Sequence, residues 1–283
     1  MHKLEIYCTT IKYYKILEKL PSYIKPLGLG EELYPKDWLT EKNGENISSL
    51  NKYYAEFTGL YWVWKNRIKN LNKDDLIGNC HNRVLWLNNI YTEKQKFSLS
   101  NLYSNLLKPS NDIFDKSDVI QVQPIIFKRK SLLSDFDEVH KNNLMRKECI
   151  NYLNFSERKK FENHLNNNKL YPHNMFITKV HIFERYCEII FPWLDKCLKY
   201  CKENDLCNQP APQDDTRLPN YNARLPGFLA ERFTSYWFDQ FEKRNLLSYA
   251  RLGKFFLSNK VNTLINPIKL PFTFCQYPTI HSF

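Results

Sequence analysis

The sequence predicts an α/β sandwich, and three observations support this prediction. Short β-prone segments alternate with longer segments of helical periodicity, and no internal repeat is present. The 283 residues are enough for one large domain, or two closely packed ones, with a substantial core. The composition, 43% hydrophobic and 25% charged, is that of a folded protein and excludes a disordered tail or a collagen-like fibre.

The N-terminal part of the chain is expected to contain two strands and one helix. Residues 4–8 alternate and are β-rich, which predicts a buried strand, and Pro and Gly then mark a loop over 21–35. Aromatic residues at helical spacing over 54–64 predict a helix that Asn46 or Ser48 can cap and that ends near Lys65-Asn66. Residues 75–87 are apolar and β-prone apart from polar residues in their middle, whereas 91–117 form a polar, loop-rich insertion.

The middle of the chain continues the alternation. The apolar segment 119–127 predicts a strand, and the proline within it favours an edge position or a bulge. Residues 131–169 have a highly charged helical pattern, and 173–178 read as a short strand. Helical periodicity returns over 182–198, where Pro192 is expected to kink or restart the helix.

The C-terminal part contains one more helix and an irregular tail. Four of the fourteen prolines fall in 208–226, which predicts an irregular loop, and an amphipathic helix follows over 228–241. No clear linker divides the chain. We therefore expect one domain over residues 1–245 and an aromatic, proline-broken extension over 246–283 that packs on it.

The net charge of +11 suggests an anionic partner such as nucleic acid, a membrane surface or a phosphorylated substrate. The alternative is lysine-rich composition bias, with the charge spread over a solvated surface. No basic block and no RNA-binding signature occurs, so we expect no nucleic-acid partner.

Glycine is scarce, with seven in the chain, which disfavours glycine-rich phosphate loops. Gly28 and Gly30 form a lone Gly-x-Gly, because Leu33 stands where a dinucleotide motif needs its third glycine. No Gly-x-x-x-x-Gly-Lys occurs either. Nicotinamide and P-loop sites are therefore not expected.

The first residues lack the long apolar stretch of a signal peptide, and no apolar run approaches the roughly 18 residues of a membrane span. We therefore expect a cytoplasmic protein, whose contact with the inner face of the membrane would be peripheral.

Three polar clusters interrupt the predicted elements. The first consists of Asn46 and Ser48 with Trp64 and Lys65 on the helix that follows. Exposed amides and capping side chains at a helix N-terminus suit a diphosphate or a sugar hydroxyl. The alternative interpretation is a capped core helix without a ligand.

The second cluster holds His81 and Arg83 in the carboxyl half of the predicted strand 75–87. Ligands of open α/β sheets lie outside the carboxyl ends of the strands, so an imidazole and a guanidinium there could hold a phosphate or a sugar. The alternative is a core histidine, whereas a buried arginine without an anion would be costly.

The third cluster pairs His173 and Asn174 with Glu231 and Arg232. Glu231 lies near the start of a helix, where a carboxylate can accept a proton from an incoming hydroxyl, and Arg232 can instead neutralise it. A Glu-Arg pair on a solvated helix face is the alternative.

Together these segments resemble a bacterial family associated with capsular and exopolysaccharide biosynthesis, whose members are regarded as glycosyltransferases of the GT-A type. The resemblance covers about residues 4–240. The segments that carry it are Asn46-Ile47-Ser48, residues 54–66 with Glu56-x-Thr58-x-x-Tyr61-Trp62-x-Trp64-Lys65-Asn66, residues 77–83, Asn174-Met175-Phe176-Ile177 and Gly227-Phe228-Leu229-Ala230-Glu231-Arg232.

The resemblance implies a GT-A-like single domain with a mixed, mostly parallel sheet flanked by helices. It implies sugar transfer from a nucleotide donor, a UDP-sugar, to a growing surface polysaccharide or lipid-linked glycan. If the reaction inverts the anomeric configuration, a choice that the sequence leaves open, Glu231 would be the catalytic general base. The residues expected to bind the donor are Asn46, Ser48, Trp64, Lys65, His81, Arg83 and Arg232, and those expected to position acceptor or donor are His173 and Asn174.

The second motif departs from the family pattern Gly-Leu-x-His-Tyr-Arg-Arg-Tyr. His81 and Arg83 remain, but Asn82, Val84 and Leu85 replace Tyr, Arg and Tyr. We expect the donor contacts made by the missing side chains to be absent, which implies a different sugar or reduced activity.

GT-A enzymes commonly hold Mg²⁺ or Mn²⁺ on an Asp-x-Asp after a strand. Here that position reads His-Asn-Arg, and the sole Asp-x-Asp, Asp135-Phe136-Asp137, lies in a helical stretch. No metal ligand is therefore assigned and metal dependence stays open, since Arg83, Lys65 or Arg232 could stabilise the departing diphosphate instead.

Two other functions remain open. The altered second motif favours a non-catalytic subunit that binds a nucleotide sugar or polysaccharide in a capsule assembly complex. A phosphotransferase acting on the capsule is a weaker alternative, because no phosphate loop or clear metal-binding acids occur.

Overall fold

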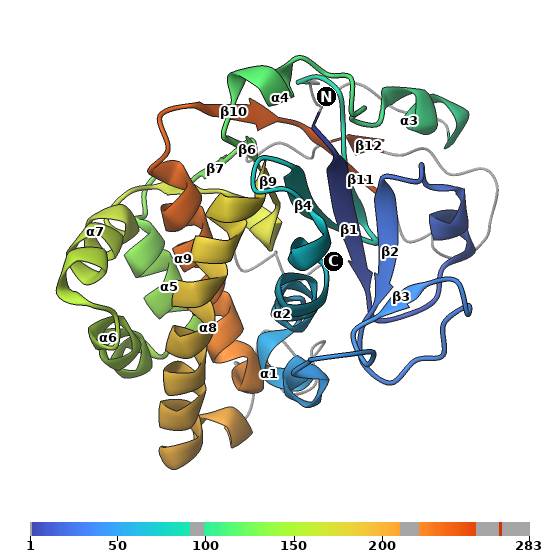
Figure 1. Ribbon diagram of the computed structural model, residues 1–283. Helices are drawn as coiled ribbons and strands as arrows, with labels where there is room; N and C mark the ends of the chain where they lie inside the picture. The colour runs from blue at the N-terminus through green and yellow to red at the C-terminus, as the bar shows by residue number, and fades with distance from the viewer. Residues whose placement is uncertain (1, 91–98, 210–220, 253–265, 268–283) are drawn as a thin grey trace.

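The computed structural model describes residues 2–90, 99–209, 221–252 and 266–267, and a mixed β-sheet forms its centre (Figure 1). The strand order is β10-β6-β9-β4-β1-β2-β3. Neighbouring strands are parallel except at β9, which is antiparallel to β4 and β6. The predicted mixed, mostly parallel sheet is therefore confirmed. Its strands are β1 Leu4–Thr10, β2 Ile24–Gly28, β3 Leu39–Thr40, β4 Leu76–His81, β6 Val119–Val122, β9 Phe176–Lys179 and β10 Arg244–Leu247.

Short strands extend the sheet beyond the carboxyl end of β4. A turn at Asn82 and Arg83 leads from β4 into β5, which pairs with β11, and β11 pairs with β12. A separate two-stranded sheet joins β7 and β8. These strands are β5 Val84–Trp86, β11 Tyr249–Arg251, β12 Asn266–Pro267, β7 Ile125–Ile126 and β8 Lys169–Leu170.

Helices cover both faces of the sheet (Figure 1). Over one face lie α1 Asn51–Tyr54, α2 Phe57–Asn66, α8 Val180–Glu203 and α9 Leu225–Asp239, with α5 Leu132–His140, α6 Asn143–Asn151 and α7 Phe155–Leu165 outside them. Over the other lie α3 Leu99–Asn105 and α4 Ile113–Lys116. The 3₁₀ turns are Lys15–Lys19, Ser48–Leu50, Ile68–Asn70, Pro172–Asn174, Leu206–Asn208 and Tyr221–Arg224.

Two hydrophobic cores follow from the alternation of side chains along the strands. Tyr7 and Ile77 pack with α2, α8 and α9, whereas their neighbours Ile6, Cys8 and Leu76 pack with α3 and α4. Because successive strand residues point to opposite faces, a strand with apolar residues at every position requires cover on both sides. This is the predicted sandwich.

The close approach of β4 and β9 depends on Gly78. A Cβ at this position would lie 2.6 Å from Cγ1 of Ile177 and 3.0 Å from the carbonyl oxygen of Phe176. Glycine therefore allows the antiparallel strand β9 to pack directly against β4 at the centre of the sheet.

The structure differs from the sequence-based predictions in several places: the predicted strand 75–87 is a hairpin of β4 and β5, and α9 begins at Leu225, inside the predicted loop 208–226. The predicted loop 21–35 was wrong in part, because it contains β2. The predicted helix over 54–64 divides at Ala55, whose φ of 50° ends α1 before α2 begins. Instead of restarting at Pro192, α8 is one helix of 24 residues.

The described part of the predicted extension 246–283 joins the main sheet. Residues 246–252 contribute to β10 and β11, and 266–267 form β12. The boundary at residue 245 lies inside β10, and the division into domain and extension stays a prediction. The rest of the extension, residues 91–98 of the predicted insertion and 210–220 of the predicted loop lie outside the described residues.

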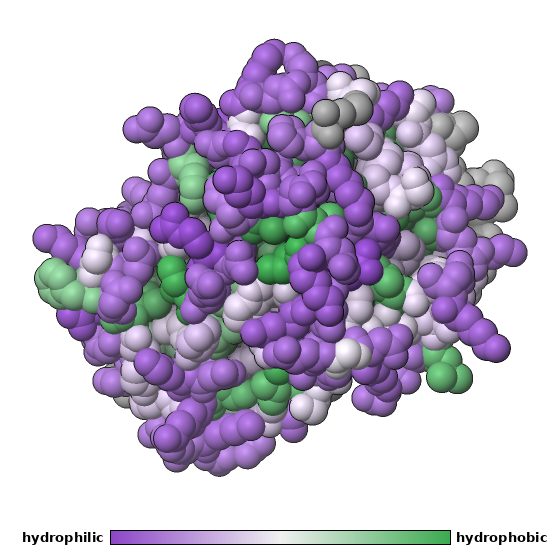
Figure 2. Space-filling model, viewed as in Figure 1, coloured by the Kyte–Doolittle hydropathy of each residue, from purple (hydrophilic) through white to green (hydrophobic). Residues whose placement is uncertain are grey.

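Hydrophilic side chains cover most of the face seen in Figure 2, with hydrophobic residues gathered in small patches between them. Within the described part of the chain, no helix combines the length and apolar character needed to cross a membrane.

Candidate active site

The candidate site begins at the carboxyl ends of β1 and β4, which are neighbours at the centre of the sheet. Thr9 on β1 lies beside His81 on β4, and its hydroxyl oxygen is 3.1 Å from Nδ1 of the imidazole. Ligands of open α/β sheets bind at this edge. The residues that follow His81 form the turn into β5, where Arg83 is exposed.

A strained turn faces His81 from the loop before β9. His173 and Asn174 have φ angles of 68° and 52°, in the left-handed region that costs a residue with a side chain about 1–2 kcal/mol. Asn79 in β4 holds this turn, because its Nδ2 donates to the Asn174 carbonyl oxygen at 2.7 Å and its Oδ1 accepts the Phe176 N–H at 3.1 Å. Backbone strain that the surroundings maintain is common at functional sites.

The carbonyl group of His173 accepts a hydrogen bond from Nε2 of His81. Because a carbonyl oxygen can only accept, we assign a ring proton to Nε2, while Nδ1 lies within hydrogen-bond distance of the Thr9 hydroxyl. His81 is partly exposed and is fixed from both sides.

The N–H of the same residue, His173, donates to Oε1 of Glu231 on α9 at 2.7 Å. Burial raises the pKa of Glu231 above its ordinary 4.5, against the opposing effects of the Arg232 charge and the His173 hydrogen bond, and the Glu56 carboxylate adds to the rise. Glu231 is nevertheless partly exposed. A reachable carboxylate with a raised pKa is suited to act as a general base.

Glu56, between α1 and α2, is a further member of this cluster. Its Oε1 accepts a hydrogen bond from Nδ2 of Asn174 at 2.6 Å. Asn174 is 3% exposed, and its Oδ1 has no hydrogen-bond partner among the described residues. The site predicted from the sequence omitted Glu56, although it lies in the motif at 54–66.

The His173 imidazole is neutral in this arrangement. Its Nε2 lies 3.2 Å from Nη2 of Arg251 on β11, and a guanidinium can only donate. Burial, with the charges of Arg251 and Arg83 and the neighbouring His81, lowers the pKa of His173 well below 6.5. Arg251 was not predicted, because the sequence signals no function in the C-terminal tail.

The residues of the first predicted cluster contact one another and their neighbours in the sequence. Asn46 Oδ1 accepts the N–H and hydroxyl of Ser48 at 3.2 and 2.8 Å. Lys65 Nζ lies 3.7 Å from the centre of the Trp64 ring and 3.7 Å from Glu45. Lys65 follows Glu56 by nine residues, so about 13 Å of helical rise along α2 separates the two. The structure does not bring Trp64 and Lys65 to the His81 cluster.

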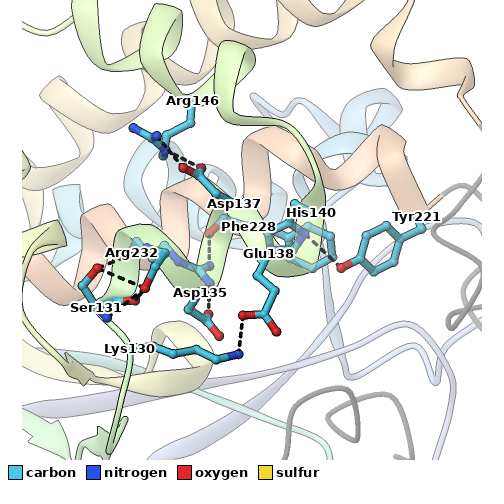
Figure 3. Close-up of polar contacts among 11 residues, drawn as sticks. Lys130, Ser131, Asp135, Asp137, Glu138, His140, Arg146, Tyr221, Phe228 and Arg232 are labelled. Atoms are coloured by element: carbon cyan, nitrogen blue, oxygen red, sulfur yellow. Dashed lines mark hydrogen bonds and ion pairs between the residues drawn. The ribbon is translucent and has the colours of Figure 1, made fainter.

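The Arg232 side chain is engaged with Asp135 on α5 and with the backbone of α9. It is 4% exposed, its Nη2 lies 2.7 Å from Oδ2 of Asp135 on α5, and its Nη1 donates to the Phe228 carbonyl (Figure 3). Burial raises the pKa of Asp135 although the Arg232 charge opposes this. The guanidinium of Arg232, which the sequence predicted to bind the donor, is therefore part of a buried ion pair.

Both carboxylates of the Asp-x-Asp sequence form ion pairs with arginines. Asp135 pairs with Arg232, and Asp137 accepts two bonds of 2.7 Å each from Arg146 (Figure 3). Across residues 2–90, 99–209, 221–252 and 266–267, no three His, Cys, Asp or Glu side chains are arranged to hold a metal. At the end of β4 the residues are histidine, asparagine and arginine, which do not fit the oxygen-rich coordination of Mg²⁺.

The geometry defines an α/β protein whose polar site lies at the carboxyl edge of a mixed sheet, with one carboxylate suited to proton transfer. The chain belongs to the family described as Domain of unknown function (DUF4422), whose model matches residues 5–243. No curated protein matches the sequence.

One solved structure is similar to this chain over most of its length. It is the apo structure of the bifunctional glycosyltransferase WbbM, with a TM-score of 0.67 and 18% sequence identity. The match covers 89% of this chain and 46% of that chain, so the protein spans about half the length of WbbM. This similarity confirms the expected fold.

Proposed function

We propose that the protein is a glycosyltransferase that moves a sugar from a UDP-sugar to a growing capsular or other surface polysaccharide, or to a lipid-linked glycan. The observation that carries this proposal is the partly exposed Glu231 beside the His81–His173 contact, at the sheet edge where ligands bind. A fold shared with a bifunctional glycosyltransferase supports it. The charge of +11 suits an anionic donor and the anionic inner face of a membrane, where the protein would act peripherally.

In the proposed reaction Glu231 removes the proton from an acceptor hydroxyl. The oxygen forms a bond to the anomeric carbon of the donor sugar while the bond from that carbon to the diphosphate oxygen breaks. The nucleoside diphosphate leaves with the electron pair, and Glu231 keeps the proton until solvent removes it. The configuration at the anomeric carbon is inverted. Holding base, acceptor and donor together removes much of the entropic cost of the reaction.

The other residues would bind and align the substrates. His81 and Arg83 face the donor, and the Nε2 proton of His81 is fixed by the His173 carbonyl. Asn174 contributes its unpartnered buried Oδ1, which can accept a sugar hydroxyl once substrate is bound. The proposed mechanism gives no role to the other five residues predicted to bind the donor, because each has a different partner in the structure. These residues are Asn46, Ser48, Trp64, Lys65 and Arg232.

The test is a turnover assay with a panel of nucleotide sugars. The full chain is incubated with each donor and with glycan or lipid-linked glycan acceptors, with Mn²⁺ and separately with EDTA. Acceptor-dependent release of nucleoside diphosphate and a product heavier by one sugar support glycosyl transfer. Phosphate transfer to the acceptor would instead indicate a phosphotransferase.

A second candidate is a non-catalytic subunit that binds nucleotide sugars or polysaccharide in a capsule assembly complex. The replaced motif residues favour it, because Val84 and Leu85 are 5% and 1% exposed and belong to the core instead of the site. Binding of nucleotide sugars in titration calorimetry, without turnover under any acceptor or metal condition, would favour this subunit.

Changes at Glu56 should separate its charge from its hydrogen bond. Glu56→Ala removes the acceptor that holds Asn174, and we expect the rate of transfer to fall about tenfold, as for a lost charged hydrogen bond. Glu56→Gln retains an acceptor oxygen but removes a charge that raises the pKa of Glu231. The fall in the activity of Glu56→Gln at acidic pH is therefore expected to begin at a lower pH than in the unchanged chain. Rate measurements from pH 4 to 9 check both results, and equal, unchanged profiles for the two variants would contradict this role.

A further inference from the structure

Two carboxylates meet at the left-handed turn 173–174. Oε1 of Glu231 on α9 accepts the backbone N–H of residue 173 at 2.7 Å, and Oε1 of Glu56, between α1 and α2, accepts the side-chain amide of residue 174 at 2.6 Å. Helices α1 and α9 approach closely because position 227 is glycine, where a Cβ would lie 3.3 Å from the carbonyl oxygen of Tyr53. Glu231 follows Gly227 by four residues, about one helical turn. Both carboxylates are therefore held at the same two-residue turn.

No cation among the described residues balances the negative charge of this pair. Within these residues neither Glu56 nor Glu231 forms an ion pair, and their hydrogen-bond donors, an amide and a backbone N–H, are neutral. Arg232, whose charge acts on Glu231, forms its ion pair with Asp135. Burial, together with the Glu56 charge, raises the pKa of Glu231, so the two carboxylates act on each other. Both side chains are partly exposed, and a ligand that reaches them meets negative charge.

A third oxygen atom at this turn lacks a partner. Asn174 is 3% exposed, and its Oδ1 forms no hydrogen bond within the part of the chain that the structure describes. Its Nδ2 is the group that donates to Glu56, so this amide lies at the carboxylate pair. An unpaired buried acceptor destabilises the protein until a ligand O–H or N–H donates to it. The side-chain oxygens of Glu56, Asn174 and Glu231, here called the oxygen cluster, therefore suit a ligand with several hydrogen-bond donors.

We infer that the oxygen cluster selects an uncharged acceptor sugar over one that carries a carboxylate, and that Glu56 sets this specificity. This inference rests on the proposed glycosyl transfer. A neutral hexose presents hydroxyl groups on neighbouring ring carbons. While one hydroxyl loses its proton to Glu231, its neighbours can donate to the oxygens of Asn174 and Glu56. A uronic acid would bring a third negative charge to two carboxylates, and unpaired like charges reject a ligand effectively.

Matched acceptors measure this selectivity. The full chain and a UDP-sugar donor are given methyl galactoside or methyl galacturonoside, and methyl glucoside or methyl glucuronoside, at the pH where each protein is most active. We expect kcat/KM to be about tenfold higher for the neutral sugar of the reactive pair. In Glu56→Gln the ratio should fall to about threefold, because one of the two repelling charges is gone. Glu188→Gln, which changes an exposed carboxylate on α8, is the matched control and should keep the original ratio.

The ratio of the two kcat/KM values separates specificity from folding. If Glu56 only holds the turn, Glu56→Gln lowers both values alike, and an unchanged ratio would overturn its role in specificity. Equal kcat/KM for neutral and uronic acceptors in the unchanged chain, or a preference for the uronic acceptor, would overturn the inference while leaving glycosyl transfer intact. Absence of transfer with every donor and acceptor would contradict the proposed function. Saturation-transfer NMR with the same glycosides then tests the oxygen cluster alone, and equal binding of both sugars would overturn the inference.

Discussion

Glu231→Gln is expected to lower the rate of sugar transfer about 10² to 10⁴-fold, the usual contribution of a general base. Glutamine has the same shape, and its carbonyl oxygen can still accept the His173 N–H that now lies 2.7 Å from Oε1. The turn should therefore stay in place while the group that takes the proton is lost. UDP affinity should change little, since the lost interaction develops only as the acceptor reacts.

The pH dependence gives an independent check on this residue. The base acts only when ionised, so activity falls as the pH falls through the pKa of Glu231, and burial raises this pKa above 4.5. The acidic limb of kcat/KM should lie above the ordinary glutamate range. Glu188→Gln, which changes an exposed carboxylate on α8, should leave rate and profile unchanged. A Glu231→Gln protein with normal turnover would exclude the proposed role.

Arg232→Met is expected to lower the free energy of unfolding by about 3–5 kcal/mol, because it leaves the Asp135 carboxylate buried without its cation. Urea unfolding followed by circular dichroism measures the change. Arg185→Met removes an exposed arginine from α8 and should change stability by less than about 0.5 kcal/mol.

The double variant tests whether the loss of stability in Arg232→Met comes from the unpaired charge of Asp135 or from lost packing. Asp135→Leu with Arg232→Met removes both buried charges, and we expect it to recover most of the lost stability. UDP affinity of folded Arg232→Met should match that of the unchanged chain. Normal stability combined with lost UDP binding would instead support the donor contact predicted from the sequence for Arg232.

The sequence predicted the alternating strands and helices because both faces of the sheet require apolar cover. β2 was missed because Pro26 and Gly28 are typical of loops. In the structure β3 pairs with only Leu27 and Gly28, so Pro26 has a strand neighbour on one side, where Cys8 of β1 lies. A proline, which has no backbone N–H to donate, is tolerated in a strand at a position where the neighbouring strand on one side is missing.

The candidate site was predictable only in part, since its contacts depend on topology. His81, His173 and Glu231 each stood out as polar groups in apolar surroundings, and the structure brings them together. Residue Glu56 meets Asn174 from 118 positions away, a contact that no local pattern encodes. Arg232 adjoins Glu231 in the sequence, but neighbours on a helix point about 100° apart, so it reaches α5 instead.

The left-handed turn has a consequence for how this site can vary. The amide hydrogen of residue 173 contacts the carboxylate on α9, and its carbonyl oxygen contacts the imidazole on β4. One main-chain residue thus sets the spacing between the group that would activate the acceptor and the group that would face the donor. Side chains at position 173 can therefore diverge without changing that spacing, and glycine would adopt the required φ of 68° most readily.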